Sequence, residues 1–382
     1  MFLFILLATT VLSQETLLLS QIIFRHSARA PVAMFTSEAS KNYFYRGLGE
    51  ISDDGLRLAH DLGQALRPRL IDNGFLDPRY IPSQSSFRSS ASGRCIVTAS
   101  AVGSALFNPV NASIPNQVNV QTMNSTDDWL CVPQTTQWLV EQMYKSVGAE
   151  YNSTSTLEEL SMNLLKNWTA NSTVFQQHAS ELDIDALPIE KDAGLPVPNW
   201  YDDAVQAETS YYLSKVNNFY TGTREYEHSQ WIRCRSGLLL YTIMNNIKRK
   251  AVCGSNCTSP KFYAYTTHDF MVQSLLGGFG LVDAALQGGV PPFTGAILIE
   301  LWQNKNNSYV KLLWRSPKAQ FVSLTAKIGN CFGLENCPVD QFTSCCSNYS
   351  SAMPQTECNY PVSVAVQQAV VTLSVMILFS HF

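Results

Sequence analysis

Alternating apolar and polar blocks in the N-terminal part of the chain predict an α/β arrangement. Residues 17–24 are almost continuously apolar, which is typical of a strand buried on both faces of a parallel sheet. Residues 51–70, ISDDGLRLAHDLGQALRPRL, carry apolar side chains at helical spacing behind a capping serine, Ser52. Residues 87–107 begin as a loop rich in serine and glycine and continue as a helix of small and apolar residues. The order strand, helix, loop, helix is typical of α/β folds.

The pattern changes over residues 113–231. Amphipathic helical segments such as TTQWLVEQMYKSV and STLEELSMNLLKNW occur there, and strand-like runs are absent. We interpret 113–231 as a helical cap domain inserted into the α/β domain.

Strand-like runs return after the cap. They occupy residues 261–269, 295–302 and 308–315. The α/β domain is therefore expected to combine 14–112 with 232–345, around a central, mainly parallel sheet flanked by helices.

The N-terminus, MFLFILLATTVLSQ, predicts a signal peptide of residues 1–13. It opens with an apolar stretch, and Val11 and Ser13 are small enough for the positions that precede a cleavage site. A buried N-terminal strand is the alternative.

Residues 346–382 are predicted to form a C-terminal tail with a membrane-anchor signal. Ser350, Ser351 and Ala352 are small, a nine-residue spacer follows, and the tail beyond it is apolar. This is the layout of a GPI-anchor signal. A single membrane span and an ordinary packed C-terminus are the alternatives. The span would lack its usual basic flank, because no Lys or Arg follows Lys327.

Composition and glycosylation sequons indicate a globular protein of the secretory pathway. Hydrophobic residues make up 46% of the 382 positions and charged residues 15%, which allows a sizeable core. The net charge is −4 and no basic run occurs, so nucleic acid is disfavoured as a partner. Eight sequons are more than a cytosolic chain of this length is expected to carry. They begin at Asn111, Asn124, Asn152, Asn167, Asn171, Asn256, Asn306 and Asn348.

Ten cysteines without a clear zinc pattern indicate an oxidising compartment. Disulfide connectivity is not determined by the sequence. The bonds we expect are two local pairs, Cys253–Cys257 and Cys331–Cys337, and a long-range bond from Cys131 to either Cys345 or Cys346.

Cationic side chains follow the first predicted strand. The run IIFRHSARAP, residues 22–31, passes from apolar residues into Arg25, His26 and Arg29. Strand ends are where open α/β folds bind ligands. Two guanidinium groups beside an imidazole lower its pKa unless an anion is present, and guanidinium groups match the oxygens of phosphate. Arg94 lies in a loop that opens a helix, which also favours an anion.

Five segments of the chain resemble the motifs of the histidine acid phosphatases. RHSARAP is similar to that family's RHGxRxP, with Ser27 in place of glycine, and FRSSASGRCIVTASAV is similar to RSTxxxRTxxSA. THD at 267–269 resembles the C-terminal HD motif, and GEISDDGLRLAHDLGQALRPRL and PPFTGAILIELW resemble two further segments. The order and spacing match over roughly residues 17–345. The chain is most similar to the animal lysosomal and prostatic branch, which implies a phosphoglycerate mutase-like fold.

The resemblance implies a role for each matching residue. His26 would be the nucleophile and form a phosphohistidine, and Asp269 would protonate the leaving group. The residues that would bind the phosphoryl oxygens are Arg25, Arg29, Arg94 and His268. No metal or other cofactor is expected, because the arginines would supply the positive charge.

The implied function is hydrolysis of small phosphate monoesters by a secreted or membrane-tethered acid phosphatase. The enzyme would reside in the secretory pathway, the lysosome, the cell surface or the extracellular space. Acid preference would arise because Asp269 must be protonated while His26 must stay neutral, and the arginines are expected to keep it neutral. A homodimer is expected from family analogy alone. Ser27 leaves an alternative open, namely a glycosylated surface or binding protein with weakened catalysis.

Overall fold

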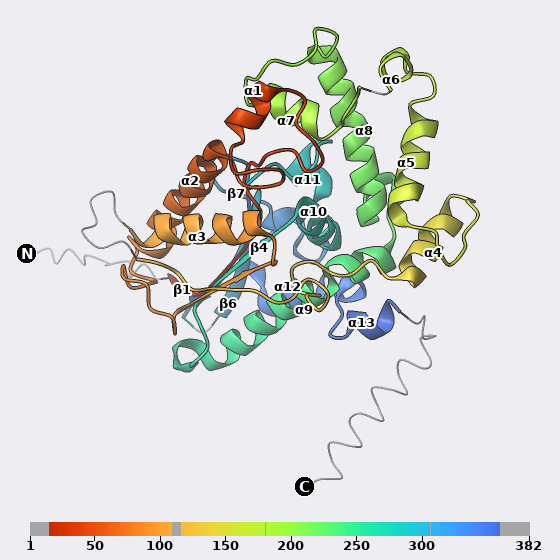
Figure 1. The fold of residues 1–382 in the computed structure, drawn as a ribbon. Helices are drawn as coiled ribbons and strands as arrows, with labels where there is room; N and C mark the ends of the chain where they lie inside the picture. The colour runs from red at the N-terminus through yellow and green to blue at the C-terminus, as the bar shows by residue number, and fades with distance from the viewer. Residues whose placement is uncertain (1–14, 109–115, 180, 306, 360–382) are drawn as a thin grey trace, which may run out of the picture.

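A mixed sheet forms the centre of the computed structural model, which describes residues 15–108, 116–179, 181–305 and 307–359 (Figure 1). Within these ranges the sheet has eight strands in the order β3-β2-β4-β1-β5-β6-β7, with β8 also paired to β6. The strands are β1 (Glu15–Arg25), β2 (Ser85–Ser89), β3 (Val120–Gln121), β4 (Phe262–Thr267), β5 (Ala296–Asn304), β6 (Asn307–Arg315), β7 (Val322–Ser323) and β8 (Cys337–Pro338).

The predicted α/β class is confirmed, but the parallel arrangement holds for one half of the sheet. β3, β2, β4 and β1 pair in parallel, whereas β1 with β5, β5 with β6, and β6 with β7 and β8 pair antiparallel. Only residues 305 and 306 separate β5 from β6. A parallel crossover needs about a dozen residues, so these two strands can form only an antiparallel hairpin.

Two short strands differ from the sequence interpretation. β2 overlaps the start of the 87–107 segment, which was predicted to begin as a loop, and β3 lies inside the 113–231 segment, which was predicted to be helical. The β2 sequence, SSFRS, contains no β-branched residue, so its composition gives no strand signal. Its central Phe87 is 1% exposed and packs into the core, which fixes the strand through tertiary contacts.

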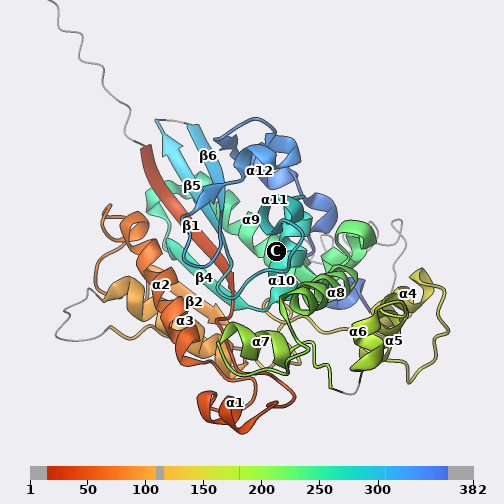
Figure 2. The same ribbon diagram turned by 90° about the horizontal axis from the view of Figure 1, so that it is seen from above.

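Helices cover both faces of the sheet (Figures 1 and 2). α2 (Asp53–Leu70) and α3 (Gly93–Phe107) pack on one face, and α9 (Ser229–Cys253) and α10 (Asp269–Gly278) pack on the other. The predicted cap of α2 is confirmed, since the Ser52 side chain accepts a hydrogen bond from the Gly55 N–H. The remaining short helices of these layers are α1 (Glu38–Tyr43), α11 (Val282–Leu286), α12 (Val339–Ser344) and α13 (Pro354–Glu357).

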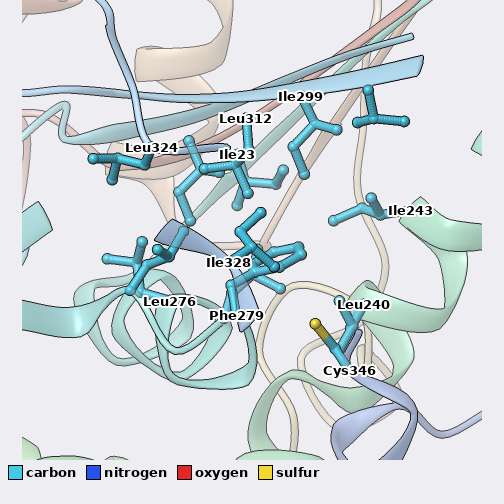
Figure 3. Close-up of a cluster of buried hydrophobic side chains, with 14 of the residues drawn as sticks. Ile23, Leu240, Ile243, Leu276, Phe279, Ile299, Leu312, Leu324, Ile328 and Cys346 are labelled. Carbon is cyan, nitrogen blue, oxygen red and sulfur yellow. The ribbon is translucent and has the colours of Figure 1, made fainter. Parts of the chain in front are cut away.

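A buried apolar cluster joins the sheet to α9 and α10 (Figure 3). Strand side chains face helix side chains across this layer. The contributing residues include Ile23, Ile299 and Leu312 from the strands, Leu240, Ile243 and Leu276 from the helices, and Phe279 directly after α10. Burial of this surface holds β1 and β4 in place, and both strands lead into the candidate site.

Five helices occupy the segment interpreted as a cap and lie beside the sheet layers (Figures 1 and 2). They are α4 (Gln137–Ser146), α5 (Leu157–Trp168), α6 (Thr173–Gln177), α7 (Ala186–Asp192) and α8 (Asp203–Thr221). Two apolar clusters hold them together, one around Met143 and Phe219, which also includes residues of α9, and one around Leu187 and Tyr201. α9 runs through the expected boundary at 231/232 without a break.

The cysteine pairing agrees with the local expectations and corrects the long-range one. Cys253–Cys257 and Cys331–Cys337 are bonded as expected. The expected bond from Cys131 is wrong, because Cys345 and Cys346 bond to each other and Cys131 is a buried free thiol. Cys131 lies beside the end of β4, where its carbonyl oxygen accepts a hydrogen bond from the Thr267 hydroxyl. Cys346 instead belongs to the apolar cluster that joins the sheet to α9 and α10. A fourth bond, Cys234–Cys358, joins α9 to the residue that follows α13.

This fourth disulfide bears on the expected anchor signal. Cys358 is 1% exposed and contacts the apolar cluster around Met143, and Ser351 is also buried. Cleavage at 350–352 would remove one half of a buried disulfide, so the structure argues against that position. The predicted signal peptide and the apolar part of the tail lie outside the described residues. In the part of the chain that is described, no helix has both the length and the apolar character needed to cross a membrane.

The sequon asparagines within the described ranges are all on the surface. Asn111 and Asn306 lie outside those ranges. The six exposed asparagines are Asn124, Asn152, Asn167, Asn171, Asn256 and Asn348.

Truncation tests the role of the C-terminal disulfide. A chain that ends after residue 350 is expected to be less stable than one that ends after residue 359 by about 2–5 kcal/mol, because it lacks Cys358 and α13. Urea unfolding of the two purified proteins measures the difference. Cys358→Ser in the longer chain isolates the disulfide, and equal stability of all three proteins would contradict its place in the core.

Candidate active site

Two distant segments meet where β1 and β4 end side by side. The strands are parallel, with Arg25 in register with Thr267, and the His26 N–H donates to the Thr267 carbonyl oxygen at 2.8 Å. This pairing brings RHSAR and THD to the same edge of the sheet. The rings of His26 and His268 lie 5.5 Å apart between centroids, at 72° to each other.

The loop after β1 is fixed by both helices on one face of the sheet. The Ser27 N–H donates to Thr98 Oγ1 of α3 at 3.0 Å, and Ser27 Oγ donates to the Gly55 carbonyl oxygen of α2 at 2.6 Å. A Cβ on Gly55 would lie 2.0 Å from the Ala28 carbonyl oxygen, so only glycine lets α2 approach this closely. The close approach holds His26 rigidly relative to the helices.

Ser27, the departure from the family motif, is accommodated without strain. Its φ lies outside the left-handed region, and the side chain is fully buried. Its hydroxyl donates to α2, so it is engaged away from the arginine side chains. No crowding of an anion site by this serine is visible.

The arginines of the first motif each bind a carboxylate. Arg25 pairs with Asp269 at 2.8 Å, donates to the Pro291 carbonyl oxygen, and lies 4.2 Å from the centre of the Phe293 ring. Arg29 binds Asp185 through both terminal nitrogens, at 3.0 and 2.8 Å. These contacts use the terminal nitrogens and fix the direction of each guanidinium group.

The same donor is left unpartnered on all three arginines. The Nε atoms of Arg25, Arg29 and Arg94 are buried and have no hydrogen-bond partner among the described residues. Buried N–H groups are usually paired in folded proteins. Other described arginines, such as Arg235 and Arg315, also have orphaned donors, but Arg25, Arg29 and Arg94 lie within electrostatic reach of one another, which favours an acceptor site here. Burial lowers the pKa of Arg25, and repulsion from Arg29 and Arg94 lowers it further. The site therefore combines unused donors with excess positive charge, which fits an oxyanion.

His26 is held as a neutral imidazole with one free nitrogen. Burial, followed by repulsion from Arg25 and His268, holds its pKa well below the usual range. The expected direction is confirmed, although burial contributes more than the arginines. Its Nδ1 lies 2.9 Å from the Ser27 carbonyl oxygen, which can only accept, so Nδ1 carries the proton. The lone pair is therefore on Nε2, which is the form that a nucleophile needs.

The two residues that follow β4 differ in charge, one neutral and one negative. Burial, with repulsion from Arg94, lowers the pKa of His268 to about 4, so this ring is neutral at mildly acid pH. Burial raises the pKa of the Asp269 carboxyl, but attraction to Arg25, helped by the hydrogen bond from the Phe270 N–H, outweighs it, and the net shift is downward. In the absence of an anion Asp269 is therefore a carboxylate.

The six site residues expected from the sequence thus gather at one edge of the sheet, and the structure adds others. Thr98, Phe293 and Ser90 support the motif, the last through a 3.1 Å contact from its Oγ to His268 Nε2. Asp185 lies 156 residues from Arg29 along the chain and had no local signal. Cys95 lies 3.9 Å from His268, and burial raises the pKa of its thiol to about 11, so it is no thiolate nucleophile.

Comparison with known proteins agrees with this site. The model of the histidine phosphatase superfamily (branch 2) matches residues 16–315. A Caenorhabditis briggsae protein named "Putative acid phosphatase 1" is 35% identical, over 91% of this chain and 83% of its own. Lysosomal acid phosphatase of Xenopus laevis is 22% identical, over 93% of this chain and 81% of its own. The chain belongs to branch 2 of the histidine phosphatase superfamily and is a phosphatase.

A solved structure supports the fold alone. A Hafnia alvei phytase in complex with myo-inositol hexakis sulphate aligns with a TM-score of 0.59 at 17% identity. The alignment covers 91% of this chain and 99% of the phytase. At this identity the likeness concerns architecture and carries no substrate to this chain.

Replacement of Ser27 tests whether the serine weakens the site. Ser27→Gly is expected to change kcat/KM by less than about threefold and to lower stability by about 1 kcal/mol, because the hydrogen bond to Gly55 is lost. Ser27→Ala, which keeps Cβ and removes only the hydroxyl, separates that bond from backbone freedom. Steady-state kinetics and thermal unfolding measure both effects. A rate gain of about tenfold or more in Ser27→Gly would mean that the serine crowds the site.

Proposed function

We propose that this protein is an acid phosphatase that hydrolyses small phosphate monoesters through a phosphohistidine on His26. The observation that carries the proposal is the set of three buried, unpartnered Nε–H groups of Arg25, Arg29 and Arg94. A phosphoryl group offers three equatorial oxygens with spread negative charge, which suits several guanidinium donors at once. Electrostatic stabilisation of that charge is commonly the largest contribution to such catalysis.

In the first step His26 Nε2 attacks phosphorus. The N–P bond forms as the bond from phosphorus to the leaving oxygen breaks, and Asp269 gives its proton to that oxygen. In the second step a water oxygen attacks phosphorus, the Asp269 carboxylate takes the water's proton, and the N–P bond breaks. His26 returns to its neutral form with the proton still on Nδ1. The positive charge comes from the arginines, so the proposal needs no metal.

Acid preference follows from the charges in the site. The lowered pKa of His26 keeps its ring neutral in acid. Asp269 starts as a carboxylate because Arg25 attracts it, but a bound phosphate dianion repels negative charge and draws Arg25 toward itself. Binding of substrate therefore raises the pKa of Asp269 and favours the protonated donor in acid. As the pH rises, Asp269 loses this proton and turnover falls.

Residence in the secretory pathway is part of the proposal. It is supported by the six exposed sequon asparagines, by four disulfides among the described residues and by similarity to Xenopus laevis lysosomal acid phosphatase. Membrane tethering, a homodimer and the natural substrate stay predictions, and the buried Cys234–Cys358 disulfide argues against an anchor signal cleaved at 350–352. The alternative of a binding protein with weakened catalysis is not favoured, because Ser27 is directed to α2 and the charged residues are in place.

Substrates whose leaving groups differ in their need for a proton test whether Asp269 is the proton donor. Asp269→Asn is expected to slow hydrolysis of glycerol phosphate by about 10²–10⁴-fold, since its alkoxide needs a proton. Hydrolysis of p-nitrophenyl phosphate is expected to fall much less, because p-nitrophenolate leaves without one. The wild-type rate on glycerol phosphate is expected to fall from acid to neutral pH.

Steady-state rates at pH 5 and above, for both substrates, measure these effects. Asp283→Asn, an exposed aspartate on α11, is the matched control and is expected to behave as wild type. Equal losses on both substrates would mean that Asp269 acts only by holding Arg25. An inactive wild type would contradict the proposed function itself.

A further inference from the structure

A carboxylate from the segment interpreted as a cap, residues 113–231, pairs with an arginine of the cluster. Asp185 immediately precedes α7 and contacts Arg29, which lies 156 residues earlier in the chain. Its two oxygens accept from Arg29 Nη1 at 3.0 Å and from Nη2 at 2.8 Å. Fork-to-fork pairing of this kind fixes the plane of a guanidinium group as well as its position.

The pairing selects which edge of Arg29 is used. A guanidinium group has donors on its Nη1–Nη2 edge and on its Nε–Nη2 edge. Asp185 takes the first edge, and Nη1 also donates to the Ala30 carbonyl oxygen. Nε is buried and unpartnered among the described residues. The edge that carries Nε is therefore the one available to a phosphoryl oxygen.

Asp185 is itself held in place from both sides. One of its oxygens accepts from the Val32 N–H at 2.9 Å, in the loop that follows the first motif. The Asp185 N–H donates to Asp183 Oδ1 at 2.8 Å. Farther along α7, the fully buried Glu190 accepts from the Thr36 N–H at 3.0 Å and from the Thr36 hydroxyl. These contacts dock α7 against the residues that lead into α1, and the two helices lie side by side in both views (Figures 1 and 2).

Asp185 also moderates the repulsion between the arginines. Arg29 lowers the pKa of Arg25, while the negative charge of Asp185 acts in the opposite direction. Asp269 likewise pairs with Arg25, although through Nη2 alone, whereas Asp185 binds both terminal nitrogens of Arg29. Each arginine of the first motif thus has one carboxylate that offsets its charge, and only Asp269 is needed as a proton carrier.

We propose that Asp185 is a positioning residue that holds Arg29 with its Nε edge toward the phosphoryl group, so that the helical segment contributes to phosphate binding. This inference rests on the proposed function. It goes beyond it by assigning a role to a residue outside the motifs. The opposite role, a carboxylate that competes with substrate for Arg29, predicts the reverse change in affinity.

The test compares Asp185→Asn with wild type in the full-length protein. The measured quantities are kcat and KM for p-nitrophenyl phosphate and Ki for inorganic phosphate. Loss of the charge-assisted pair is expected to raise KM and Ki together, each by about tenfold, with a smaller effect on kcat. Glu181→Gln, an exposed carboxylate of the same segment, is the matched control and is expected to leave all three values unchanged.

A double-mutant cycle separates positioning from stability. In the Arg29→Ala background, Asp185→Asn is expected to have no further effect on KM or Ki, because the group it positions is gone. Additive losses, or a loss of thermal stability that accounts for the change, would overturn the proposal. A lower Ki for phosphate in Asp185→Asn would also overturn it, since that result identifies a competitor.

The outcomes for this proposal and for the proposed function differ. Wild-type protein without phosphatase activity contradicts the function, whereas active wild type with an unaffected Asp185→Asn contradicts only the positioning role. If thermal unfolding shows that Asp185→Asn does not fold, Asp185→Glu is used in its place. The longer side chain shifts the guanidinium while keeping the charge, so a raised KM supports the proposal and an unchanged KM overturns it.

Discussion

Repulsion among buried guanidinium groups is the constraint on which this site depends. Arg25 and Arg29 are each less than a tenth exposed, Arg94 is partly buried beside them, and each keeps a buried Nε–H without a partner. Taking charges out of water costs several kcal/mol per ion unless opposite charge and hydrogen bonds compensate. Asp185 and Asp269 compensate in part. The remaining positive potential binds a phosphate dianion, and it adds to the larger effect of burial in keeping His26 neutral.

The fold meets this constraint by bringing separate segments to one edge of the sheet. Parallel pairing of β1 and β4 places the residues after each strand side by side. The missing side chain at Gly55 lets α2 press against the loop that carries His26. α3 supplies Arg94 from its first turn, where an anion is also favoured by the helix dipole. The segment interpreted as a cap, residues 113–231, contacts the site through Asp185. The ion pair between Arg29 and Asp185 therefore joins the α/β part of the chain to that segment.

The sequence was sufficient for the elements and residues with local signals. The apolar run of β1 and the capped periodicity of α2 were placed correctly. The motif residues around His26 follow β1 as expected, and their roles stay predictions. β2 was missed because a serine-rich strand has no intrinsic β signal and is fixed by Phe87 in the core. Asp185 and the Cys234–Cys358 bond were missed because each depends on contacts over more than a hundred residues, 156 and 124 respectively. Burial of His26 likewise outweighs the arginines that the sequence made visible.

The central claim is that the arginine cluster presents phosphate to Nε2 of His26. The most direct measurement is mass spectrometry of peptides from enzyme quenched in alkali during turnover of p-nitrophenyl phosphate, because the N–P bond of phosphohistidine survives in base. The account predicts phosphate on the peptide that contains His26. It also predicts that the signal is lost in His26→Ala and kept in His60→Ala, which removes an exposed histidine of α2. Phosphate on another side chain, or an active His26→Ala protein, would contradict it.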